Sequence, residues 1–336
     1  METRRIVVGL LNSVKIFNAE LLENKLDNVQ YKVIATTGQT HEQMIASVDG
    51  CEVLFGSPRF IQPIIPQLPT SVKWVQFTYA GLDGFFESYK ETPNAPAWDI
   101  QYTRMGDVFA LPISEYVLGA VIAIERDFKE MFKLQSAKQW ADFDDYVMYM
   151  TKPRPLNSLT AGILGAGNIG TKIAELLKAV GMRVIGFKNH QVDRDDGLFD
   201  EFYYPDNLDM FLSSCDFICN ILPSTPNTIG LLSGKRLEIC EPRKPAFINV
   251  GRGNIIDEKS LIQALTNGWI SKAFLDVLHE EPLLPSSKLW EMDNVVITPH
   301  VSGPFVKGQL TLMFKENLKL YIQELKFQVY PSSNSY

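Results

Sequence analysis

Short apolar runs alternate with amphipathic stretches along the first part of the chain. Helical spacing of apolar residues predicts helices over residues 19–26 and 41–47. Buried strands are predicted at residues 6–11, 33–35, 53–55 and 72–77. This alternation is typical of a parallel sheet that is covered by helices on both faces.

The alternation resumes after a polar loop with two prolines at residues 151–158. One helix is predicted before this loop, over 111–128, one after it, over 171–180, and one near the end of the chain, over 308–325. Further strands are predicted at residues 160–164, 183–187, 217–221, 246–250, 272–275 and 295–297. The chain is therefore expected to contain a second doubly wound α/β unit.

The composition is that of an ordinary globular protein. The 336 residues are 46% hydrophobic and 21% charged, with a net charge of −7, and a chain of this size suits two domains. No Lys/Arg run predicts nucleic-acid binding, and no apolar stretch predicts a membrane span. The four cysteines lack the spacing of a zinc site, so no metal is expected, and free thiols favour a cytoplasmic location.

The second unit opens with a glycine-rich turn between a predicted strand and a predicted helix, Gly165-Ala-Gly167-Asn168-Ile169-Gly170. In this context the spacing is the dinucleotide-binding fingerprint. Gly165 would permit the tight turn, Gly167 would let a pyrophosphate approach the backbone, and Gly170 would let helix and strand pack closely. A purely structural turn is the alternative.

The strand after this turn is followed by Lys188-Asn189-His190 rather than by an acidic residue. A lysine cannot accept hydrogen bonds from a ribose diol, but it can pair with a 2′-phosphate. The sequence therefore favours NADP over NAD, with Arg194 as a candidate second cation. The alternative is that Lys188 points into solvent and that NAD is bound with weak ribose contacts.

Three motifs that follow predicted strands of the second unit hold candidate catalytic side chains. They are NVGRG at residues 249–253, LDVLHEEP at 275–282 and TPH at 298–300. Because ligands of open α/β sheets bind at the carboxyl ends of the strands, we expect all three motifs to face one crevice.

Taken in order, the glycine turn, NVGRGNIIDEKSLIQAL, AFLDVLHEEP and NVVITPHVSG resemble the motifs of the D-isomer-specific 2-hydroxyacid dehydrogenase family. The KLW run with Trp290 looks most like the glyoxylate/hydroxypyruvate reductase branch. The resemblance implies an α/β fold with two doubly wound domains. A Rossmann nucleotide-binding domain, residues 111–304, would be inserted into a flavodoxin-like substrate-binding domain, residues 1–110 and 305–336.

The resemblance also implies NAD(P)H-dependent reduction of a small 2-oxo acid to the D-2-hydroxy acid. Arg252 would bind the carboxylate and the ketone oxygen, which suits the fixed fork of a guanidinium group. His300 would donate a proton to the carbonyl oxygen as hydride reaches the carbon. Glu281 would fix the tautomer of His300 and keep it protonated. The alternatives are a loop arginine and an exposed turn carboxylate.

Further roles implied by the resemblance concern substrate and cofactor binding. The backbone N–H groups of Ala80 and Gly81 would bind the substrate carboxylate, and Tyr79 beside them stands where the family often has a small residue. Asp276 would accept a hydrogen bond from the nicotinamide carboxamide. The loop with Pro223 is equally typical of a structural turn. The predicted cofactor contacts are Gly165, Gly167, Asn168, Ile169, Lys188, Asn189, Leu222, Pro223, Thr225, Val250 and Asp276.

A dinucleotide-sensing regulatory protein, similar to the corepressors of this family, is the alternative function. Such proteins can retain Arg252, Glu281 and His300, but the compact chain has no long extension of biased composition, which disfavours the role. The expected partners are the small-molecule acid and a second copy of the chain, without nucleic acid or membrane. The apolar helix over 111–128 would suit a homodimer interface, or equally an internal core position.

Overall fold

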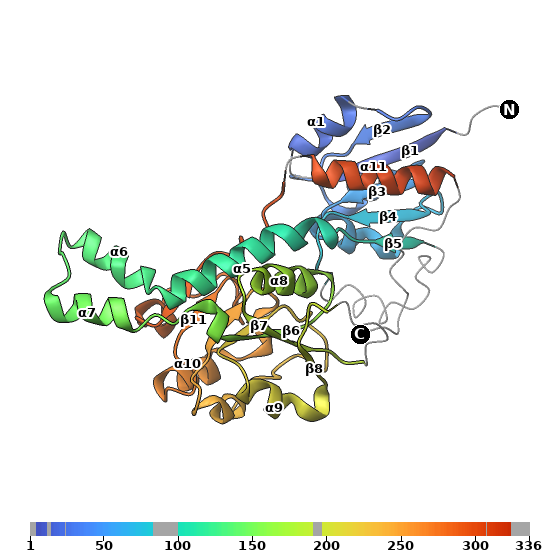
Figure 1. Cartoon of the computed structure of the whole chain (residues 1–336). Helices are drawn as coiled ribbons and strands as arrows, with labels where there is room; N and C mark the ends of the chain where they lie inside the picture. Colours follow the sequence, from blue (N-terminus) through green and yellow to red (C-terminus); the bar gives the residue numbers. More distant parts are fainter. Residues whose placement is uncertain are drawn as a thin grey trace. The chain divides into compact units, whose positions relative to one another are not determined.

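The computed structural model describes residues 5–11, 15–23, 25–82, 100–190, 197–306 and 308–323. Arg194 and the C-terminal segment 331–336, which the sequence predicts to be a frayed tail, lie outside the described residues. The chain divides into two compact units, Met1–Phe109 with Phe305–Tyr336, and Ala110–Pro304. Figure 1 shows the elements of each unit along the chain.

The first unit is built on a sheet of five parallel strands in the order β2-β1-β3-β4-β5. This is the flavodoxin-like order, so the predicted fold of the unit is confirmed. The strands are β1 (Ile6–Leu11), β2 (Val29–Val33), β3 (Val53–Gly56), β4 (Trp74–Phe77) and β5 (Gln101–Thr103).

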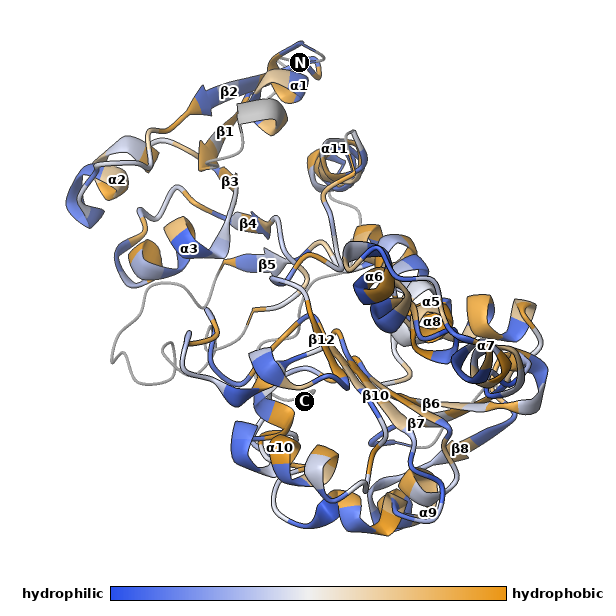
Figure 2. Ribbon diagram, turned by 90° about the vertical axis from the view of Figure 1, so that its left-hand side faces the viewer, coloured by the Kyte–Doolittle hydropathy of each residue, from blue (hydrophilic) through white to orange (hydrophobic). Residues whose placement is uncertain are grey.

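Helices cover both faces of this sheet, with α1 and α11 on one side and α2 and α3 on the other (Figures 1 and 2). They are α1 (Lys15–Glu23), α2 (His41–Val48), α3 (Pro58–Ile61) and α11 (Gln309–Ile322). The ring of Phe314 on α11 stacks on Phe55, with centroids 4.2 Å apart, and on Trp74 at 5.6 Å. The last described helix therefore completes the core of the first unit.

The prediction for β2 was wrong in position, because the strand begins at Val29 and not at residue 33. Only Val29 of its five residues is buried. A strand at the edge of a sheet leaves most side chains in solvent, so no continuous apolar run marks it in the sequence.

The second unit holds a sheet of seven parallel strands in the order β12-β11-β10-β9-β6-β7-β8. From β6 the chain first runs outward through β7 and β8, then returns to the other side of β6 at β9. This is the Rossmann order, and its topological switch point lies between β6 and β9. The strands are β6 (Thr160–Leu164), β7 (Arg183–Phe187), β8 (Glu201–Tyr203), β9 (Phe217–Asn220), β10 (Ala246–Asn249), β11 (Ala273–Leu275) and β12 (Val295–Ile297).

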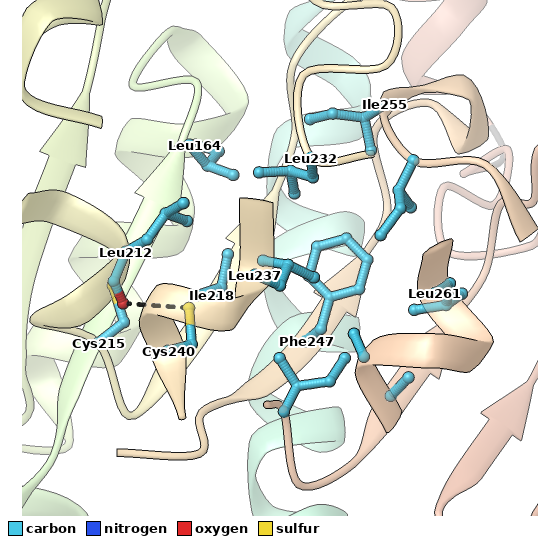
Figure 3. Packing of buried hydrophobic residues seen from close by; sticks show 14 of the residues in the cluster. Leu164, Leu212, Cys215, Ile218, Leu232, Leu237, Cys240, Phe247, Ile255 and Leu261 are labelled. Carbon is cyan, nitrogen blue, oxygen red and sulfur yellow. Dashed lines mark hydrogen bonds between the residues drawn. The ribbon is translucent and has the colours of Figure 1, made fainter. Parts of the chain in front are cut away.

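Helices α5 (Ala110–Glu125) and α8 (Asn168–Ala179) cover one face of this sheet, and α9 (Leu208–Ser213) and α10 (Glu258–Thr266) cover the other (Figures 1 and 2). The α9/α10 face holds an apolar core in which Phe247 and Leu237 are almost fully buried (Figure 3). The thiol of Cys240 donates a hydrogen bond to the carbonyl of Leu212 in this core, at 3.7 Å. This core packs against the strands that carry the site loops at their carboxyl ends.

Two helices between α5 and β6 were not predicted from the sequence. They are α6 (Phe128–Ser136) and α7 (Phe143–Thr151), which extend away from the sheet of the second unit (Figure 1). All their residues are described, and none of their side chains is buried. Their exposed aromatic side chains therefore do not form the buried stripe by which a helix is recognised in sequence.

The segment Asp107–Glu125 is, within the described residues, the one helix long and apolar enough to cross a membrane. Its main part, α5, packs against α8 and buries Ile113, Val117 and Val121. One face of α5 thus serves as a core helix of the second unit.

Candidate active site

The glycine turn between β6 and α8 has two glycines that packing requires and one that leaves space. Gly165 has a φ of +110°, and a Cβ there would lie 3.1 Å from the backbone of Ile221. A Cβ on Gly170 would overlap the carbonyl oxygen of Gly165. A Cβ on Gly167 would meet no described atom within 4 Å, and Gly167, the N-cap residue of α8, has no side chain to cap the helix. The helix start can therefore accept a pyrophosphate group.

The end of β7 presents a cation and no carboxylate in residues 188–190. Lys188 is half-buried, and its amine lies 5.6 Å from the ring centroid of Phe202. Asn189 is exposed. This arrangement fits a 2′-phosphate better than a bare ribose diol, because a lysine donates hydrogen bonds and accepts none.

The loop after β9 is a braced turn. The hydroxyl of the buried Thr228 donates a hydrogen bond to the carbonyl of Pro223 at 2.6 Å and accepts one from the N–H of Thr225 at 2.8 Å. Leu222 is buried in the core of the unit. The turn follows directly from the switch point, and its contact with a cofactor stays a prediction.

Arg252 lies between two glycines for a steric reason. A Cβ on Gly251 would come 2.8 Å from the Cα of Ile221, and one on Gly253 would overlap the carbonyl of Leu278. The loop after β10 therefore lies directly against the loops after β9 and β11. Val250, buried at the start of this loop, donates its N–H to the carbonyl of Asn220 at 3.1 Å.

Two buried asparagines, which sequence reasoning missed, hold the backbone of Arg252. Asn220 and Asn249 end the neighbouring strands β9 and β10 and lie opposite each other in the sheet. The amide of Asn220 donates to the side-chain oxygen of Asn249 at 2.8 Å. Both amides also donate to the carbonyl of Arg252, at 3.4 and 3.3 Å. The available signal was an asparagine one residue before the end of each of two predicted apolar strands.

His300 and Glu281 form a hydrogen-bonded pair, with Nδ1 2.8 Å from Oε2. The other carboxylate oxygen of Glu281 accepts the N–H of Leu278 at 3.0 Å. The hydrogen bond that His300 donates to Glu281 raises the pKa of His300, whereas burial and the charge of Arg252 lower it. With Nδ1 directed at Glu281, the Nε2 atom of His300 is left for a substrate.

The pKa of Glu281 is lowered even though its partial burial acts to raise it. The hydrogen bonds from His300 and from the N–H of Leu278, together with the charges of His300 and Arg252, outweigh the burial. The carboxylate therefore stays ionised where His300 is protonated. The guanidinium of Arg252 acts electrostatically on both members of the pair, so the three side chains share one electrostatic environment.

Asp276 organises the loop that carries His300. Its carboxylate, 1% exposed, accepts hydrogen bonds from the hydroxyl of Thr298 at 2.6 Å and from the N–H groups of Val301 and Ser302, each at 2.8 Å. Its backbone carbonyl accepts the N–H of His300 at 2.9 Å. These bonds hold His300 at a φ of +56°, a conformation that non-glycine residues rarely adopt.

The predicted contact of Asp276 with nicotinamide is compatible with these bonds. A carboxylate offers about four acceptor positions, of which three are used here. One position of Asp276 thus remains for a carboxamide N–H, and the contact stays a prediction.

Tyr116 on α5 is a second residue that sequence reasoning missed. Its hydroxyl is hydrogen-bonded to the hydroxyl of Thr298. Because Thr298 directs its own proton to Asp276, Tyr116 is the donor in this bond. Burial raises the pKa of Tyr116 to about 12, so it remains a donor at neutral pH. No pattern in the sequence marked this tyrosine.

The second unit thus brings together Arg252, Asp276, Glu281 and His300, whereas Ala80 and Gly81 belong to the first unit, where they follow β4. Tyr79 beside them packs the edge of its ring against Phe305, with centroids 5.4 Å apart. The bulky side chain therefore lies against an aromatic residue of its own unit.

Residues 118–302 match the sequence profile described as D-isomer specific 2-hydroxyacid dehydrogenase, NAD binding domain. A glyoxylate reductase of Thermofilum pendens is 29% identical over 221 residues, which are 65% of this chain and 63% of that protein. An uncharacterised protein of Corynebacterium melassecola, from the region 3′ of proB, is 30% identical over 289 residues, covering 84% of this chain and 89% of its own.

Solved structures show the same likeness over nearly the whole chain. A D-isomer specific 2-hydroxyacid dehydrogenase family protein from Aeromonas salmonicida has a TM-score of 0.82 and 27% identity, covering 98% of this chain and all of its own. An NADPH-dependent glyoxylate/hydroxypyruvate reductase from Sinorhizobium meliloti, solved with NADP and sulfate, has a TM-score of 0.80 and 25% identity, covering 98% and 99%. The chain therefore belongs to the D-isomer specific 2-hydroxyacid dehydrogenase family and is an NAD(P)-dependent oxidoreductase.

Proposed function

We propose that the protein reduces a small 2-oxo acid, of the size of glyoxylate or hydroxypyruvate, to its D-2-hydroxy acid. The observation that carries the proposal is the His300–Glu281 pair beside Arg252, on loops that follow β10, β11 and β12. The likeness to a glyoxylate reductase and to a glyoxylate/hydroxypyruvate reductase supports the choice of a small acid.

Each catalytic side chain has one task in this reaction. The guanidinium of Arg252 binds the carboxylate and the ketone oxygen and orients the carbonyl group. The reduced nicotinamide, when bound, supplies a hydride to the carbonyl carbon. His300 transfers the proton on Nε2 to the carbonyl oxygen, which completes the hydroxyl group. Glu281 holds the imidazolium on its Nδ1 side. In the oxidative direction neutral His300 takes the proton back.

NADPH is the proposed nucleotide. Lys188 follows β7 as a half-buried cation, and residues 188–190 include no acid to bind a ribose diol. The open space at Gly167, the N-cap residue of α8, suits the pyrophosphate of either nucleotide, so Lys188 is the residue that distinguishes them.

Steady-state rates with NADPH and NADH across 2-oxo acids of graded size test this proposal. We expect turnover of glyoxylate and hydroxypyruvate, lower rates with longer side chains, and a lower KM for NADPH than for NADH. The absence of turnover with every acid and both nucleotides would contradict an enzymatic role. Retained nucleotide binding in that case would favour the regulatory alternative.

We further propose that the protein is a homodimer that associates through α6 and α7. Phe132 on α6 and Phe143 on α7 are 61% and 78% accessible to solvent, and Trp140 in the loop between the two helices is 93% accessible. Aromatic residues grouped on one surface are typical of protein interfaces. The inner face of α5 packs against α8. The exposed aromatic side chains lie on the segment that follows α5.

Size-exclusion chromatography with light scattering tests the oligomeric state. The wild-type protein is expected to elute as a dimer and a Phe132→Asp/Phe143→Asp variant as a monomer, whereas a monomeric wild type would contradict the proposal.

We also propose a cytoplasmic location, because Cys51, Cys215, Cys219 and Cys240 are buried free thiols. Fractionation of cells that produce the full-length protein tests this location.

A further inference from the structure

In the first unit, the loops after β4 and β5 leave the sheet side by side. The two strands are parallel neighbours, with Gln76 opposite Thr103. Residues 78–81 and residues 104–105 therefore emerge at the same edge of the sheet, at the carboxyl ends of the strands.

Two successive carbonyl groups of the β4 loop are bound by the β5 loop. The carbonyl of Tyr79 accepts the backbone N–H of Met105 at 3.3 Å. The carbonyl of Ala80 accepts Nη1 of Arg104 at 2.7 Å. In a planar trans peptide the C=O and the N–H point in opposite directions. The N–H groups of Ala80 and Gly81 must then point away from the β5 loop.

These two N–H groups are placed to bind an anion. Within the described part of the chain, neither donates a hydrogen bond to another residue. Both residues are half-buried, so the groups are sheltered but accessible. Successive backbone N–H groups directed to one side form a concavity that attracts negative charge. The family resemblance implies that the substrate carboxylate binds at these groups.

A buried hydrogen-bond network fixes the base of both loops. The indole N–H of Trp74 donates to the hydroxyl of Thr103 at 2.8 Å, and this hydroxyl donates to the side-chain oxygen of Gln76 at 2.7 Å. The amide of Asn317 on α11 donates to the same oxygen at 3.0 Å. Arg104 follows Thr103 directly, so this network also holds the backbone of Arg104 in place.

We propose that Arg104 is a positioning residue for substrate binding. Its hydrogen bond to the carbonyl of Ala80 sets the direction in which the N–H of Gly81 meets the substrate carboxylate. The positive charge of the Arg104 guanidinium, which is hydrogen-bonded to this carbonyl, also polarises the peptide group and strengthens the N–H of Gly81 as a donor. This inference rests on the proposed function, since it concerns the acid that the enzyme reduces.

Arg104→Met removes the hydrogen bond and keeps much of the side-chain volume. The substrate carboxylate is bound in the ground state and in the transition state alike, so KM for the 2-oxo acid should rise about tenfold with kcat little changed. KM for the nucleotide should stay the same. Arg104→Lys keeps a charged donor and should restore most of the affinity. Arg5→Met, at the exposed residue before β1, is the matched control.

Binding of oxamate, a non-reducible analogue, to the protein with NADPH is measured by calorimetry as a second readout. It should weaken about tenfold in Arg104→Met and recover in Arg104→Lys. The inference is overturned if Arg104→Met leaves both KM and oxamate affinity unchanged, or if the lysine variant fails to restore them. It is also overturned if kcat and nucleotide affinity fall in parallel, which indicates general damage. A wild-type protein with neither turnover nor oxamate binding removes the proposed function, and the inference with it.

Discussion

Glu281→Gln isolates the charge that faces His300 while it keeps the shape of the side chain. The 2.8 Å hydrogen bond from His300 to Glu281 is the largest effect that raises the pKa of His300. Reduction requires protonated His300, so kcat/KM has its maximal value at pH values below this pKa and falls as the pH rises through it. Removal of the carboxylate lowers the pKa of His300, and the fall of kcat/KM must then occur at lower pH.

The size of the effect follows from the exposure of the pair. A hydrogen bond to a charged group contributes about 1.5–3 kcal/mol when it is well buried. The side chains of His300 and Glu281 are 54% and 36% exposed, so solvent screening reduces this contribution to about 1 kcal/mol. That free energy corresponds to a rate about fivefold below wild type on the alkaline side of the profile. On the acid side, where His300 is protonated in both proteins, the rates should be nearly equal.

The assay is kcat/KM for the 2-oxo acid from about pH 5 to pH 9 at saturating nucleotide, across the range in which histidine titrates. Glu280→Gln is the matched control, because Glu280 is an exposed neighbour and its removal should leave the profile unchanged. In the oxidative direction the signs reverse, since neutral His300 is then required and the rise should begin at lower pH in Glu281→Gln. An unshifted profile, or an equal loss at every pH, would refute the reasoning.

The glycines and the lysine of the nucleotide unit yield further predictions. Gly253→Ala places a Cβ against the carbonyl of Leu278 and should lower the free energy of unfolding by about 1–3 kcal/mol in chemical denaturation. The Cβ of Gly167→Ala meets no described atom within 4 Å, so this variant should leave the free energy of unfolding unchanged and raise KM for the nucleotide. A destabilised Gly167→Ala together with a Gly253→Ala of wild-type stability would contradict the roles assigned to the two glycines. Lys188→Ser should raise KM for NADPH about tenfold and leave KM for NADH within about twofold, as expected for a charge-assisted bond; equal effects on both nucleotides would argue against a phosphate contact.

Strands that are buried on both faces were predictable from the sequence alone. The bounds of β1, β6 and β7 agree with the predicted ranges because continuous apolar runs mark them. Helices α6 and α7 were missed because their apolar side chains meet no core of the unit. Without a buried stripe, these helices leave no pattern of apolar residues that a single sequence could reveal.

In the candidate site, too, motifs revealed some residues and only the structure revealed others. Arg252, Glu281 and His300 were found from motifs that follow strands, and their roles remain predictions. The hydrogen-bond functions of Asn249 and Tyr116 were not predictable, because they depend on which donors a neighbouring loop presents to each acceptor. Such an assignment needs the positions of groups far apart in the chain.

The central claim is that His300 delivers the proton in the reduction of a 2-oxo acid. NADPH consumption with hydroxypyruvate should be measured for the wild type, for His300→Ala and for His279→Ala, a change at an exposed histidine nearby, with the configuration of the product determined. We expect the D-hydroxy acid, a kcat about 10²–10⁴-fold lower in His300→Ala at unchanged nucleotide affinity, and a wild-type rate in His279→Ala. An L-product, or a His300→Ala variant as fast as the wild type, would contradict the account.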